Sequence, residues 1–290
     1  METVGFVGVG KIGFPITQNL IKSGYRVLGY RRHSLAEFEK IGGIAAKSPA
    51  EIGEQVDIIF SCLPSDAALD EVIQGPQGLV HSARPGQIIV ELGSYPLPVK
   101  ERQIAPLAAK GAIFLDGEMS GTPGMVAARK GVVFLSGDRG AANRVEPIVS
   151  AFAELCIYFG PFGAASKVKL INNLLVAAHI TATAEAMAIG LKAGVDVPLM
   201  IKAIATGSGA STQFGIRAPW MAERRFTPQQ GSSGGLAHYL EMVGDLAKSL
   251  DQPTPLRDRL EEIFARGVPM IGERDVSALL EVIETWPHKN

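Results

Sequence analysis

Lys169 and Asn173 stand out in this 290-residue chain, because a lysine that faces apolar surroundings is costly unless it is paired or used in chemistry. Residues four positions apart share one face of a helix, and both lie in an apolar segment, residues 163–194, with no internal glycine before Gly190. A lysine in apolar surroundings loses hydration, which lowers its pKa toward the working range of a base. Lys167 lies about 200° round the helix from Lys169 and should be solvated. The alternative is that Lys169 only snorkels to solvent near a helix N-terminus.

The element that must position these side chains is a long helix over residues 163–194. Its alphabet of Ala, Leu, Ile and Met predicts a helix that is buried on most of its circumference. We therefore expect two domains, residues 1–162 and 163–290, with a cleft beside Lys169. Further helices are predicted at residues 197–206, 236–250, 254–266 and 275–285, with glycine- and serine-rich breaks at 207–211 and 231–235.

The N-terminal residues 3–30 read as a strand, a glycine-rich turn, a helix and a second strand. This context makes Gly8-x-Gly10-x-x-Gly13 a dinucleotide-binding fingerprint. Gly8 permits a tight turn, Gly10 admits a pyrophosphate, and Gly13 allows close packing of helix on strand. The helix N-terminus then offers free N–H groups to the phosphates. The alternative is a glycine-rich turn that binds nothing.

The end of the second strand indicates which nicotinamide cofactor is used. An NAD-binding fold usually places an acid there for the ribose 2′-hydroxyl, but this chain has Arg31, Arg32, His33 and Ser34. Two guanidinium groups and the Ser34 hydroxyl favour a 2′-phosphate and therefore NADP(H), and the alternative is a solvated basic loop. We also expect cofactor contacts from Lys11, Ile12, Leu63, Pro64, Ser94 and His238.

Further apolar segments predict strands at residues 57–64, 87–94, 113–116, 131–136 and 156–159, alternating with helical stretches such as 66–73 and 98–110. This alternation is typical of an α/β fold, a Rossmann-type doubly wound sheet, here followed by an all-helical domain. Ligands bind beyond the carboxyl ends of such strands. Ser94 and Ser120 lie at these ends, and Ser120 with the N–H groups of Gly121 and Thr122 suits a small anion such as a carboxylate. The alternative is that these are plain turn residues.

The composition excludes several classes of partner. With 28 Lys and Arg against 29 Asp and Glu, the chain has no charge excess for nucleic acid or an anionic membrane. We expect no membrane-spanning helix and no signal peptide, since the first strand begins at Thr3. Cys62 and Cys156 are expected to be buried free thiols in the cytoplasm, although a disulfide between them stays open. The five histidines are scattered, and no metal-ligand spacing is present.

The motifs in order resemble those of the β-hydroxyacid dehydrogenase family over nearly the whole chain. Residues 7–15 and 19–24 are similar to its cofactor signature, 116–121 to its substrate loop D-A-P-V-S-G-G, and 160–173 to its catalytic segment. The resemblance implies hydride transfer between a nicotinamide and a β-hydroxyacid or semialdehyde, and a homodimer or homotetramer. It also implies a catalytic Lys169 assisted by Asn173, a substrate carboxylate held by Ser120 and Gly121, and a Ser94 that meets substrate and nicotinamide.

The sequence departs from this family at three places. His238-Tyr239-Leu240 replaces the usual K-D-L, Gly231 stands where relatives often carry Phe, and Thr122 replaces a second glycine. We therefore expect Gly231, Tyr239 and Thr122 to line a wider, less polar pocket for a bulkier substrate. Two alternatives are an imine reductase on the same scaffold and a non-catalytic NADP-binding sensor or scaffold. Retention of Lys169 argues against both.

Overall fold

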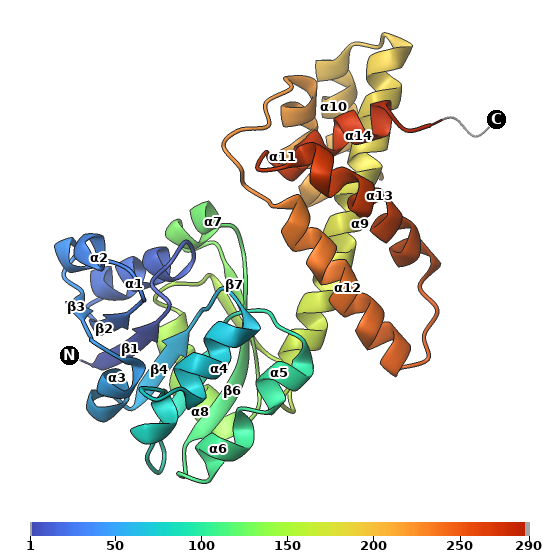
Figure 1. Ribbon diagram of the computed structural model, residues 1–290. Coiled ribbons are helices and arrows are strands. Elements are labelled where there is room, and N and C mark those ends of the chain that lie inside the picture. Colours follow the sequence, from blue (N-terminus) through green and yellow to red (C-terminus); the bar gives the residue numbers. More distant parts are fainter. Residues whose placement is uncertain (1, 288–290) are drawn as a thin grey trace. The chain divides into compact units, whose positions relative to one another are not determined.

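Figure 1 shows the computed structural model of the chain, which describes residues 2–287. The chain forms two compact units, Met1–Lys169 and Leu170–Asn290. The first contains an eight-stranded sheet with helices, and the second is helical. The predicted fold class is thereby confirmed. The junction lies inside one helix, α9 (Ala164–Ala193), which begins in the first unit and continues into the second.

The sheet of the first unit has the strand order β3-β2-β1-β4-β5-β6-β7-β8. Every neighbouring pair is parallel except β6 and β7, which are antiparallel. The order reverses between β1 and β4, and such a switch point is where an α/β sheet binds its ligand. The strands are β1 (Thr3–Val7), β2 (Arg26–Tyr30), β3 (Ile44–Ala45), β4 (Ile58–Ser61), β5 (Ile88–Glu91), β6 (Ile113–Ser120), β7 (Val132–Ser136) and β8 (Leu155–Tyr158).

Helices cover both faces of the sheet because successive strand residues point to opposite sides. In β1, Val4 and Phe6 belong to a core that includes residues of α1, α7 and α8, whereas Val7 belongs to one that includes residues of α3 to α6. These helices are α1 (Gly13–Lys22), α3 (Pro49–Gln55), α4 (Asp66–Gln74), α5 (Leu97–Glu101), α6 (Ile104–Ala108), α7 (Pro123–Ala127) and α8 (Arg139–Val149), and α2 (Ala36–Lys40) precedes β3.

Two predicted elements differ from those observed. The segment at 113–116 continues as a strand to Ser120, because residues 116–120 pair with β7. Glu118 and Ser120 therefore lie in a strand rather than in a loop. The helix predicted over 98–110 is split into α5 and α6. Pro106 has no N–H to donate to the carbonyl of Arg102, so one continuous helix would lack a hydrogen bond there.

The second unit packs its helices around the inner side of α9. Its core includes Ala177, Ile180, Ala184 and Met187 from that helix. The other elements are α10 (Val197–Ala205), α11 (Thr212–Ala222), α12 (Ser233–Ser249), α13 (Pro255–Ile271), the 3-10 turn Val276–Ala278 and α14 (Leu279–Glu284). The predicted C-terminal helix at 275–285 is therefore a 3-10 turn followed by a short α-helix.

The long helix α9 and the two cysteines bear on the expectations of no membrane-spanning helix and of free thiols. By length and composition alone α9 could cross a membrane, which the sequence had not led us to expect. Apolar residues of α9 pack in the core of the helical unit, and this packing accounts for the apolar composition of the helix. Cys62 and Cys156 are not joined in a disulfide, and both are partly rather than fully buried. Burial raises the pKa of Cys62 to about 12, so this thiol is a poor nucleophile.

Candidate active site

The glycine-rich turn has the geometry that nucleotide binding requires. Gly8 has a φ of +98°, and a Cβ there would lie 2.2 Å from the Cys62 carbonyl oxygen. A Cβ on Gly13 would lie 2.1 Å from the carbonyl oxygen of Gly8. At Gly10, by contrast, no atom comes closer than 4.0 Å to the Cβ position. The turn is thus closely packed at its ends and open in the middle, where a phosphate must approach, and it leads directly into α1.

The two arginines after β2 are placed differently. Arg31 donates from Nε to the Ser34 carbonyl at 2.6 Å and from Nη1 to the Val9 carbonyl at 3.0 Å. Its Nη2 also donates to Ser34. Arg31 therefore ties the basic loop to the glycine-rich turn. Arg32 is exposed, as are Ser34 and Lys11, and no hydrogen bond or ion pair of Arg32 is found within the described chain. Of the two guanidinium groups, that of Arg32 is therefore the more available to an anion.

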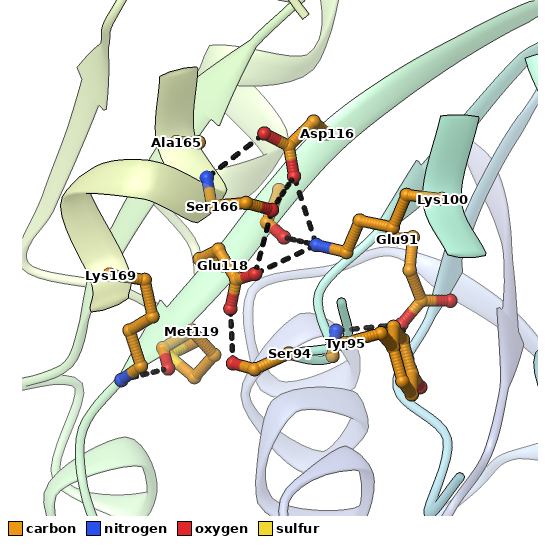
Figure 2. Close-up of polar contacts among 12 residues, drawn as sticks. Glu91, Ser94, Tyr95, Lys100, Asp116, Glu118, Met119, Ala165, Ser166 and Lys169 are labelled. Carbon is orange, nitrogen blue, oxygen red and sulfur yellow. Dashed lines mark hydrogen bonds and ion pairs between the residues drawn. The ribbon is translucent and has the colours of Figure 1, made fainter. Parts of the chain in front are cut away.

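Lys169 lies on the first turns of α9 with its amine against the end of β6. It is 7% exposed, and its Nζ donates to the Met119 carbonyl at 3.1 Å (Figure 2). Burial lowers the pKa of Lys169, and the negative charge of Glu118 partly offsets this. Asn173, one turn further along, is 6% exposed and accepts a hydrogen bond from Asn172. Lys167 is exposed, as the helix geometry predicted.

A buried charge cluster surrounds the start of α9. The Lys100 ammonium, fully buried on α5, donates to Asp116 at 2.9 Å, to Glu118 at 2.8 Å and to the Gly117 carbonyl at 2.9 Å. Figure 2 shows it between the two carboxylates. Ser166 of α9 closes the cluster, since its N–H and hydroxyl both donate to Asp116. The cluster thus fixes the first turn of α9, which carries Lys169.

Ser94 and Ser120 occupy the predicted strand ends, but their surroundings differ. The Ser94 hydroxyl donates to Glu118, and this contact points Ser94 toward β6 (Figure 2). Ser120 is half-buried at the last residue of β6, and Gly121 follows it. Thr122 caps α7 by accepting the Met125 N–H at 3.3 Å, so its hydroxyl has a structural role.

Burial and the neighbouring charges act in opposite directions on the pKa values of the cluster. Burial alone would lower the pKa of Lys100, but Glu118 and Asp116 raise it, so the ammonium is retained. Burial also opposes ionisation of Asp116, yet Lys100 and Ser166 lower its pKa below the usual value. Burial dominates at Glu91 and Glu118 and raises the pKa of each, although Lys100 acts in the opposite direction on both.

In the helical unit, Gly231 is packed against the guanidinium group of Arg217. A Cβ at position 231 would lie 2.9 Å from Arg217 Nη2 and 3.2 Å from Val276. Arg217 is buried and forms an ion pair with Asp275, and its Nε–H has no partner in residues 2–287. Arg217 therefore occupies the space beside Gly231, and a wider substrate pocket at Gly231 stays a prediction.

The remaining predicted residues lie at the surface or partly buried. His238 is exposed and 3.2 Å from Glu241, and Tyr239 is half-buried beside Leu170, Met242 and Val243 of the helical unit. Leu63 is half-buried and Pro64 exposed after β4, near the glycine-rich turn, since Leu63 also lies 3.1 Å from the Cβ position of Gly8. Contact of these residues with cofactor or substrate stays a prediction.

Sequence reasoning missed Lys100, Glu118 and the buried Glu91. The signal was present, because Glu91, Asp116 and Glu118 are acids inside apolar strands, where an ionised group needs a partner. Position 118 also departs from the D-A-P-V-S-G-G pattern, which has proline there. What the sequence did not indicate was the partner, since Lys100 lies on a helix with an ordinary mixture of residues.

The sheet and its glycine-rich turn indicate a dinucleotide-binding protein, and comparison with known proteins gives the family. Residues 3–160 match the NAD binding domain of 6-phosphogluconate dehydrogenase, and residues 163–283 match the family described as NAD-binding of NADP-dependent 3-hydroxyisobutyrate dehydrogenase. The chain is 30% identical to L-threonate dehydrogenase of Cupriavidus necator over 97% of its own length and 96% of that protein. The chain therefore belongs to the β-hydroxyacid dehydrogenase family and is an oxidoreductase.

Solved structures agree with this assignment. A 3-hydroxyisobutyrate dehydrogenase from Salmonella typhimurium has a TM-score of 0.86 and 27% identity, covering 97% of this chain and all of that one. An imine reductase from Myxococcus stipitatus has a TM-score of 0.67 and 17% identity, with 98% and 100% coverage. The second similarity shows a shared fold.

Proposed function

We propose that the chain is an NADP(H)-dependent dehydrogenase or reductase of a β-hydroxyacid or semialdehyde, with Lys169 as its general acid and base. The observation that carries this proposal is a buried lysine amine on α9, 3.1 Å from the Met119 carbonyl at the end of β6 and next to Ser120 in the chain. The resident cofactor, when bound, supplies or accepts the hydride. The test is NADPH consumption on a panel of semialdehydes, ketoacids and cyclic imines, with Lys169→Ala as the control.

The proton chemistry follows from where Lys169 lies. In reduction its ammonium donates a proton to the oxygen of the carbonyl group as negative charge develops there, and in oxidation the neutral amine removes the hydroxyl proton. Desolvation lowers the pKa of Lys169, which favours the neutral amine relative to an exposed lysine. The Met119 carbonyl accepts one of its N–H groups and thereby orients the amine. Asn173 would orient the substrate oxygen or the amine.

The preference for NADPH depends on Arg32 in particular. Arg32→Ala should raise the Michaelis constant for NADPH by roughly 10- to 100-fold and leave that for NADH nearly unchanged, because one charge-assisted contact with the 2′-phosphate is lost. Arg31→Ala should weaken both cofactors, since Arg31 holds the Val9 carbonyl of the turn. Steady-state kinetics with both cofactors separate these outcomes. Equal Michaelis constants for NADPH and NADH in the unmodified protein would contradict the NADP assignment.

Ser120 tests the carboxylate site. It ends β6, and Gly121 and Thr122 follow it with N–H groups that could bind an anion. Ser120→Ala should reduce kcat/KM for an acidic substrate by about tenfold, the value of one hydrogen bond to a charged group, and affect an uncharged substrate of equal size much less. Thr122→Ser, which keeps the α7 cap, is the matched control. If uncharged substrates react best and are indifferent to Ser120, the hydroxyacid assignment is wrong and the imine alternative gains.

Lys169 also bears on the alternative that the chain is an imine reductase. An imine reductase in this fold usually lacks the lysine, as the resemblance implies, and Lys169 is retained here.

We also propose a homodimer or homotetramer in the cytoplasm. The support is an exposed apolar patch on the helical unit that includes Ile189, Val195 and Leu199, since apolar patches of this kind usually mark an interface.

A further inference from the structure

Glu118 is a carboxylate at a position where the family pattern D-A-P-V-S-G-G has proline. It lies on the same face of β6 as Asp116 and Ser120, because the side-chain period of a strand is two. Its Oε1 accepts from Lys100 at 2.8 Å, and its Oε2 accepts from the Ser94 hydroxyl. Glu118 therefore connects the buried Lys100 with a serine at the predicted reaction site (Figure 2).

The direction of the Ser94 contact has a consequence for what Ser94 can bind. A serine hydroxyl has one hydrogen to donate and two lone pairs. An ionised carboxylate only accepts, so the hydrogen of Ser94 is used by Glu118. Toward substrate or cofactor, Ser94 then presents only lone pairs. It suits a donor such as a hydroxyl or a carboxamide N–H, and it does not suit a carboxylate.

The ionised form of Glu118 fits the balance of charge around it. The titratable groups that face the cluster are Lys100 from α5, Asp116 from β6, Glu91 from β5 and Lys169 from α9, with Cys62 and Tyr95 nearby. Two lysines balance Asp116 and Glu118 if Glu91 is protonated. Glu91 accepts from the hydroxyl of a different serine, Ser61, and from the Gly93 N–H, whereas the Ser94 hydroxyl donates to Glu118. Buried charges require such pairing.

We propose that Glu118, held by Lys100, is a positioning residue for the reaction: it takes the hydrogen of Ser94, so that Ser94 only accepts. Next in the chain to Met119, whose carbonyl accepts from Lys169 at 3.1 Å, it also places a negative charge near the Lys169 ammonium. This inference rests on the proposed role of Lys169. It concerns which hydrogen-bonding group of the substrate or cofactor Ser94 selects and at which pH Lys169 changes its charge.

Glu118→Gln tests both parts because it keeps the shape and removes the charge. The Gln amide should donate to Ser94 and reverse that hydrogen bond, which should lower the pH-independent kcat by about 10- to 100-fold, the usual effect of losing a supporting partner. In a protein that already carries Ser94→Ala, Glu118→Gln should lower the pH-independent kcat by no more than about twofold, because the hydrogen bond between Ser94 and Glu118 is already absent. The pH midpoint assigned to Lys169 should move to lower pH in either reaction direction, because the Glu118 charge that favours the ammonium is lost.

Glu91→Gln is the matched control, since it removes a buried, serine-bonded glutamate of the same cluster. It should lower thermal stability as Glu118→Gln does, but leave the Lys169 midpoint and the Ser94 coupling unchanged. If Glu118→Gln does not fold, Glu118→Asp serves instead: it keeps the charge and so the midpoint, while the shorter side chain loses Ser94 and lowers the pH-independent kcat.

Four outcomes would count against the inference or against the proposed function. An unchanged midpoint with additive losses for Ser94→Ala and Glu118→Gln would overturn the inference and leave Glu118 a structural residue. The same conclusion follows if Glu118→Asp behaves as the unmodified protein. Normal turnover in Lys169→Ala would instead contradict the proposed function, whereas an inactive Lys169→Ala together with a Glu118→Gln protein that matches Glu91→Gln contradicts the role of Glu118 alone.

Discussion

Lys169→Ala should lower turnover by about 10²- to 10⁴-fold, the contribution of a positioned general acid, while NADPH still binds. The reason is that the amine is buried against the Met119 carbonyl at the end of β6, whereas the glycine-rich turn that suits the phosphates follows β1. Turnover and a cofactor-fluorescence titration on the same preparation measure the two effects separately.

Two neighbouring variants act as controls. Lys167→Ala should change little, because Lys167 is exposed, and Asn173→Ala should fall between the other two. A Lys169→Ala protein with normal turnover would mean that the proton comes from another group. Joint loss of cofactor binding and thermal stability would mean that Lys169 is structural, the alternative that the sequence left open.

Asp275→Ala should reduce the free energy of unfolding of the helical unit by about 3–5 kcal/mol, the cost of leaving a buried charge without its partner. Asp275 is fully buried, forms the ion pair with Arg217, and accepts the N–H groups of Gln230 at 2.7 Å, Gly231 at 2.8 Å and Ser277 at 2.9 Å. Its removal strands all of these donors. Urea denaturation followed by circular dichroism provides the measurement.

Arg224→Ala is the matched control, because it breaks an exposed ion pair with Glu284 in the same unit. That pair should contribute less than about 1 kcal/mol. The Asp275 contribution should also depend on pH. Hydrogen bonds from Ser277 and the charge of Arg217 outweigh burial and lower the pKa of Asp275 in the folded state. Its stabilisation is complete above the unfolded-state pKa and is lost as the pH falls through the folded-state pKa. Equal losses in the two variants would contradict this account.

Much of the fold could be predicted because local signals agreed with one another. The strand, glycine-rich turn and helix at 3–24 form a unit whose pattern, turn chemistry and packing all indicate one structure. The antiparallel pairing of β6 with β7 was not predicted, since an apolar strand reads alike in either direction. The split at residues 102–103 was missed because a helix-like pattern outweighed one proline.

The residues of the candidate site could be named from the sequence, but most of their hydrogen-bond partners could not. Lys169 and Ser94 could be placed from spacing and resemblance, but the carboxylate that binds Ser94 could not, because it comes from a different strand 24 residues later. Arg31 and Arg32 looked equivalent in the sequence, and only the structure shows that one serves the backbone. The sequence also did not indicate that Arg217, 14 residues earlier, packs against Gly231.

The glycine-rich turn has an implication for how such chains evolve. Gly8 and Gly13 are required by neighbouring carbonyl oxygens of the chain itself, whereas only the middle position, Gly10, has open space around it. Selection for folding alone would therefore preserve the first and last glycines in a descendant that had abandoned its nucleotide. Gly10 would be the first of the three to drift. A fingerprint with intact ends and a substituted middle would thus record a lost activity.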